Sequence, residues 1–88
     1  MSKSITIARG RELLDAAIPA NPDATGRAAE WQAERADAVA VLDWFEAAGP
    51  ATLSKPLRTR KASRLTDILV AAGTPYADAI AVGFMLIK

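Results

Sequence analysis

The clearest pattern of apolar and polar positions lies in residues 27–48, which contain no glycine or proline. One apolar stripe at helical spacing is formed by Trp31, Ala38, Leu42 and Phe45, and a second by Ala33, Ala36, Ala40, Trp44 and Ala47. Glu30, Glu34 and Asp37 make a polar face. Two stripes predict a central helix over residues 26–48 with neighbours on two sides, and Gly49-Pro50 is a strong stop signal.

A first segment, residues 5–18, places Leu13, Leu14 and Ile18 at helical spacing before the prolines of a connector. At its start Ile5 and Ile7 alternate with polar residues, as in a short strand. A strand followed by two helices is the element order of ribbon-helix-helix proteins, and this alternative stays open beside an all-helical one.

A third helix is predicted over residues 59–72, with Thr59 as its cap and Gly73 as its end. Its apolar positions Leu65, Ile68 and Leu69 face inward. The preceding residues 50–58 are expected to be irregular, because a proline at position 56 opposes a long helix.

The last segment opens with Thr74-Pro75, a favourable helix start, and Tyr76, Ile80, Phe84 and Ile87 then share one helical face. This predicts a helix over residues 75–87. However, residues 81–87 are apolar all round, so a strand or hairpin as in a winged helix remains the alternative.

Length and composition favour one small helical domain covering residues 1–88, mostly α, as a compact bundle of three to four helices. Much of the apolar half of the chain is alanine, so larger side chains must supply the core. These are Leu13, Leu14, Ile18, Trp31, Leu42, Trp44, Phe45, Leu57, Leu65, Ile68, Leu69, Tyr76, Ile80, Phe84, Met85, Leu86 and Ile87.

Charge is unevenly distributed although the net charge is only +1. Residues 1–54 sum to −3 and residues 55–88 to +4, with five cations inside ten residues: Lys55, Arg58, Arg60, Lys61 and Arg64. The amino end of a helix disfavours cations and attracts anions. Cations stacked there predict a surface for phosphates, as in nucleic acid, or for an acidic protein partner.

The run GPATLSKPLRTRKASRLTDILVAAGTPY, residues 49–76, resembles the second half of a winged helix-turn-helix: a short helix, a basic helix and a hairpin. The resemblance implies a DNA-binding transcription regulator. In that case Arg58, Arg60, Lys61 and Arg64 would face DNA, with Ser63 and Thr66 as polar contacts.

The chain has no histidine and no cysteine, which removes the commonest general base, nucleophile and transition-metal ligands. We therefore expect no enzyme activity, no small-molecule substrate, no cofactor and no metal. The longest apolar run, residues 79–87, is nine residues, and no signal-peptide pattern is present, so we expect a soluble cytoplasmic protein without membrane contact.

Two functions are consistent with these features. The first is a small nucleic-acid-binding regulator that uses residues 55–64 against phosphates, as a homodimer. The alternative is a protein-binding module, such as an anti-CRISPR-like phage inhibitor or an antitoxin-like partner that blocks a larger complex. Its interface anchors would be the aromatic residues Trp31, Trp44, Tyr76 and Phe84.

Overall fold

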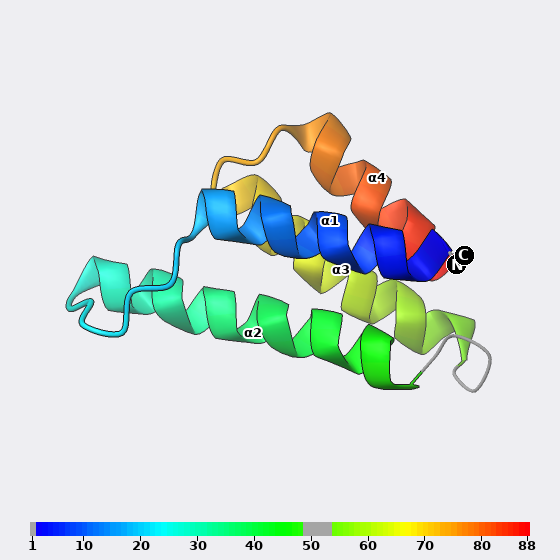
Figure 1. The fold of residues 1–88 in the computed structure, drawn as a ribbon, viewed down its shortest axis with the longest axis horizontal. Helices are drawn as coiled ribbons and strands as arrows, with labels where there is room; N and C mark the ends of the chain where they lie inside the picture. Colours follow the sequence, from blue (N-terminus) through cyan, green and yellow to red (C-terminus); the bar gives the residue numbers. More distant parts are fainter. Residues whose placement is uncertain (1, 49–53) are drawn as a thin grey trace.

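Four α-helices make up the computed structural model, which describes residues 2–48 and 54–88. They are α1 (Ser2–Ala17), α2 (Arg27–Ala48), α3 (Lys55–Ala71) and α4 (Tyr76–Ile87). Each helix packs against the next along the chain, and α4 also packs against α1 (Figure 1). The prediction of a compact, mostly α bundle is confirmed.

The core lies between the helices, and each helix contributes large side chains to it. Six are completely enclosed: Leu14, Leu42, Leu65, Ile68, Leu69 and Leu86. Each contributes about 1.5–3 kcal/mol relative to an exposed side chain. These six residues are among the large apolar side chains that the sequence predicts for the core.

The amino-terminal segment is helical from Ser2, so the strand alternative for Ile5 and Ile7 is wrong, and the ribbon-helix-helix order with it. On a helix these two positions are about 200° apart. Accordingly Ile7 is buried while Ile5 is exposed.

The carboxy-terminal segment forms α4, so the strand or hairpin alternative is wrong, and no wing exists in the described residues. The side chains of Ala79, Val82 and Leu86 and the backbone of Gly83 are buried, at helical rather than alternating spacing. A Cβ added at Gly83 would overlap the hydroxyl of Thr66 on α3. The absence of a side chain at Gly83 thus lets α4 approach α3 closely.

The start of α3 differs from the sequence prediction, which placed it at residue 59. The helix begins at Lys55, and the Ser54 hydroxyl caps it by accepting a hydrogen bond from the Leu57 amide at 3.3 Å. Pro56 lies in the first turn, where a backbone donor has no helical partner, so it does not interrupt the helix.

The end of α3 at Gly73 is confirmed. Gly73 has φ +106°, and the Thr74 and Gly73 amides donate to the carbonyls of Leu69 and Val70 at 2.9 and 3.1 Å. This is a Schellman cap, which needs the left-handed conformation that glycine adopts without strain. Pro75 is the N-cap residue of α4 rather than its first helical residue.

Two predictions of burial are wrong. Most of the second stripe on α2 is exposed, including Ala33, Ala36 and Ala40, because α2 lies at the edge of the bundle and buries mainly its first stripe. On α4, four predicted core residues are exposed: Tyr76, Ile80, Phe84 and Met85. The predicted Gly49-Pro50 stop lies outside the described residues.

Candidate nucleic-acid interface

Arg64 lies in the middle of α3 and joins that helix to α2. Its Nη2 donates to Asp37 Oδ2 at 2.8 Å and to Glu34 Oε2 at 3.3 Å. The hydrogen bond to Asp37, with the charge of Glu34, raises the pKa of Arg64 above its ordinary value, so the side chain stays charged up to strong alkali. Arg64 is therefore half exposed but already balanced by two carboxylates.

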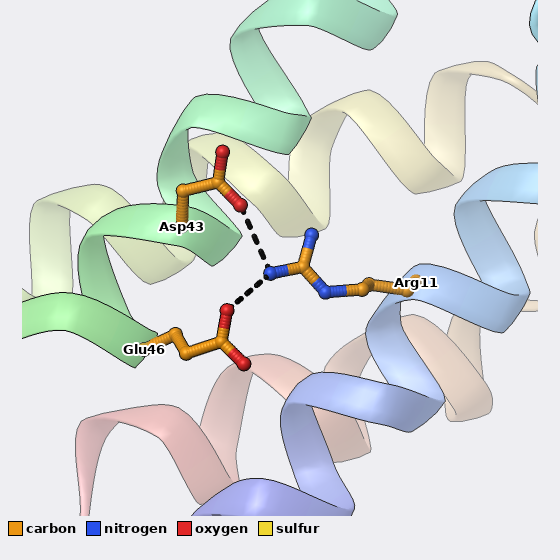
Figure 2. Close-up of polar contacts among 3 residues, drawn as sticks. All are labelled: Arg11, Asp43 and Glu46. Carbon is orange, nitrogen blue, oxygen red and sulfur yellow. Dashed lines mark hydrogen bonds and ion pairs between the residues drawn. The ribbon is translucent and has the colours of Figure 1, made fainter.

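Arg11 makes the same kind of link between α1 and α2. Figure 2 shows its Nη2 between Asp43 Oδ1 and Glu46 Oε1, at 2.9 Å from each. The hydrogen bond to Asp43 contributes most to raising the pKa of Arg11. Arginines from the two neighbouring helices thus occupy four of the carboxylates that α2 presents.

The α1–α2 connection is fixed by a third arginine, on α2 itself. Arg35 Nη1 lies 2.8 Å from Asp15 Oδ1 and donates to the Ile18 carbonyl at 2.8 Å. Next to it, Gln32 donates to the Pro19 carbonyl at 3.0 Å. These contacts hold the first turns of α2 against the end of α1 and the residues that follow it, and they leave the Arg35 side chain mostly buried.

Arg58 connects the beginning of α3 to the end of α4. Its Nε donates to the Ile87 carbonyl at 3.3 Å. A cation near the carboxyl end of a helix is stabilised by the partial negative charge there. The sequence showed only that Arg58 stands near the unfavourable end of its own helix, whereas the fold supplies the favourable end of another.

Lys61 lies over an aromatic ring, with its Nζ 5.2 Å from the ring centroid of Trp44. Trp44 is half-buried and meets Phe45 edge to face at 5.0 Å between ring centroids. Trp31 is likewise half-buried against the core. Two of the four predicted interface anchors are thus packed against the bundle, whereas Tyr76 and Phe84 are exposed.

Lys55 and Arg60 extend into solvent from the first two turns of α3, and neither makes an ion pair among the described residues. Lys88 adjoins the same region, because the bond from Arg58 holds residue 87 against the start of α3. Its Nζ lies 5.8 Å from the ring centroid of Phe84. Figure 1 shows the start of α3 and the end of α4 toward the same end of the molecule. We call this region the basic end; it comprises Lys55, Arg58, Arg60, Lys61 and Lys88.

Sequence reasoning missed Lys88, which is 27 positions or more from the other cations of the basic end. The feature of the sequence that indicates the position of Lys88 is the short turn at residues 73–75. Two helices joined by so few residues run back along one another, which returns the last residue of the second to the start of the first.

An open hollow continues from the basic end along the seam between α2 and α3. Its charged lining consists of Arg60, Lys61, Arg64 and Asp37, over an apolar floor that includes Leu57 and Val41. Its volume is about 460 Å³. Because Arg64 is paired with Asp37, the positive charge of the rim comes from Arg60 and Lys61, which suits an anionic group better than a neutral one.

In the part of the chain that the structure describes, no three acidic side chains come together as a metal site, and no helix is long and apolar enough to cross a membrane. No protein-family model matches the sequence, and neither the curated proteins nor the solved structures include a match to it. The proposed function therefore rests on the described residues and their contacts.

Proposed function

We propose that the chain is a small non-enzymatic protein that binds nucleic acid through its basic end. The observation that carries the proposal is the gathering of Lys55, Arg58, Arg60, Lys61 and Lys88 from two helices at one end of the bundle. Sequence-independent binding of nucleic acid depends on such clustered cations, because each phosphate contact releases condensed counterions.

Local electrostatics support an anionic ligand here. Along α3 the described residues from Ser54 to Thr66 include no carboxylate, and the helix start adds partial positive charge. The carboxylates of α2 nearest to α3, Glu34 and Asp37, are bound to Arg64, one turn farther from the helix start. Both carboxylates are therefore already paired with a cation outside the basic end.

The second candidate is an acidic surface of a protein, as in an inhibitor or antitoxin-like module. The same cations favour it, and the exposed Tyr76 and Phe84 would supply anchors of the kind that dominate protein interfaces. Nucleic acid is the stronger candidate because its backbone presents an array of phosphates that several clustered cations can contact together. Measured affinity for DNA and RNA, and its dependence on salt, separates the two candidates.

The test is fluorescence anisotropy with labelled duplex DNA of about 20 base pairs and single-stranded RNA, between about 50 and about 200 mM NaCl. Three to four phosphate contacts predict that the affinity falls about 50- to 150-fold over this range. The double variant Lys55→Gln/Arg60→Gln should lower the slope of log affinity against log salt by about two phosphate contacts.

The matched control is Arg9→Gln/Arg27→Gln, which removes the same net charge from exposed positions on α1 and α2. It should leave the salt slope unchanged. Absence of binding to both DNA and RNA at the lowest salt contradicts the proposal and leaves the acidic protein surface in its place. Equal slopes for the two double variants contradict the assignment to the basic end.

A further inference from the structure

A second surface lies on the other side of α3, where α3 and α4 form an apolar groove of about 400 Å³. Three large side chains of α4 stand along it one turn apart: Tyr76, Ile80 and Phe84, with 67%, 39% and 63% of their surface exposed. Val70 of α3, 39% exposed, extends the same patch. Asp67 is the one charged residue in its described lining, so covering the groove removes little charge from water.

We infer that this groove is the interface of a homodimer, in which the α4 helices of two copies pack antiparallel about a two-fold axis near Ile80. The inference does not rest on the proposed nucleic-acid contact, because it uses the apolar residues of the groove and none of the cations, although the two surfaces adjoin where Lys88 Nζ lies 5.8 Å from the ring centroid of Phe84.

The size of the patch is the first argument. A fully covered Tyr or Phe buries about 150–250 Å², so Tyr76 and Phe84 expose roughly 100–150 Å² each. With Ile80 and Val70 the apolar area is on the order of 350 Å². A standard interface buries about 800 Å² per partner, of which about 450 Å² is apolar. The patch therefore supplies most of the apolar area that one partner contributes to a standard interface.

The spacing of the side chains is the second argument. Tyr76 and Phe84 lie four residues on either side of Ile80. A two-fold axis across α4 at Ile80 brings Tyr76 of one copy against Phe84 of the other, twice, and Ile80 against itself. The stripe is thus complementary to itself, which is the requirement of an isologous interface. Aromatic rings in such pairs adopt offset or edge-to-face contacts that add to simple burial.

The first test is sedimentation equilibrium of the whole chain from about 10 µM to about 1 mM. The average mass of the wild type should rise toward twice that of the monomer. Phe84→Asp should weaken dimerisation at least about tenfold. Ile5→Asp is the control, because it makes the same kind of change at an exposed position (75%) outside the groove lining, and it should dimerise as the wild type does. Circular dichroism checks that each variant keeps its helix content.

The second test locates the axis, and the absence of native cysteine makes it direct. Disulfides need Cα atoms about 4.4–6.8 Å apart. Ile80→Cys should therefore oxidise to a dimer, whereas two Tyr76→Cys chains are held about 12 Å apart along the helices and should not. A mixture of Tyr76→Cys and Phe84→Cys chains should yield the mixed dimer.

A wild type that stays monomeric at the highest concentration overturns the inference and opens the groove to a different occupant. Equal dimerisation of Phe84→Asp and wild type overturns it as well, by placing the interface elsewhere. Efficient self-crosslinking of Tyr76→Cys without crosslinking of Ile80→Cys contradicts the proposed axis.

Discussion

The two flanks of α3 are built by different means. On the α2 flank, long charged side chains bridge the helices, with Arg64 reaching Glu34 and Asp37. On the α4 flank the helices touch through small residues, with Gly83 directly against Thr66. Half-exposed ion pairs therefore link α3 to α2, whereas the backbone of α4 packs closely against α3.

This difference explains where the two candidate surfaces arise. Ion pairs on the α2 flank neutralise Arg64, whereas Lys55 and Arg60, nearer the helix start, make no ion pair among the described residues. Close approach on the α4 flank directs the small face of α4 inward, so its large residues Tyr76 and Phe84 are left outside. A basic end and an apolar groove thus result from how α3 is packed on each side.

The largest expected effect is at the close contact. Gly83→Ala should destabilise the protein by about 1–2 kcal/mol, because overpacking at so close a contact costs about 2–3 kcal/mol, the upper end of the usual range, and better helix propensity returns about 1. The added Cβ meets Thr66 Oγ1, so Thr66→Ala in the same chain should restore most of the loss. Urea unfolding followed by circular dichroism measures both.

Gly10→Ala is the control for this prediction. Its added Cβ would lie 2.9 Å from Leu42 Cδ2, the end of a flexible side chain that can move aside, so its cost should be smaller. If Gly83→Ala is as stable as the wild type, the α3–α4 contact is not close-packed and the comparison fails.

A smaller effect is expected on the α2 flank. Arg64→Gln should reduce stability by less than about 1 kcal/mol at low salt, since exposed ion pairs contribute little, and by less still in about 1 M NaCl. A double-mutant cycle with Asp37→Asn isolates the pair. A loss of stability larger than that of Gly83→Ala would reverse the ranking of the two flanks. A loss that salt does not reduce would contradict the assignment of the α2 flank to ion pairs.

Several parts of the fold were predictable because they depend on neighbours in sequence. The apolar stripe through Ala38, Leu42 and Phe45 and the glycine that ends α3 follow from helical periodicity and from φ preferences. The predicted start of α3 at residue 59 is wrong because Ser54 is the N-cap residue, which places Pro56 in the first turn, where proline is tolerated.

The remaining errors and omissions concern contacts between helices, which local patterns do not encode. The apolar character of α4 predicted a buried face at Tyr76, Ile80 and Phe84, but Gly83 decides which face meets α3. Likewise the cluster at residues 55–64 was visible in the sequence. The balance of Arg64 by α2 and the addition of Lys88 depend on tertiary packing.

The central claim is that packing leaves α3 and α4 with two different surfaces, the basic end and the apolar groove. An NMR titration of the ¹⁵N-labelled chain with duplex DNA tests this claim most directly. The account predicts the largest amide shifts in residues 54–61 and at Lys88, with residues 76–80 little affected. Shifts concentrated along residues 70–84, or no shifts at low salt, would contradict it.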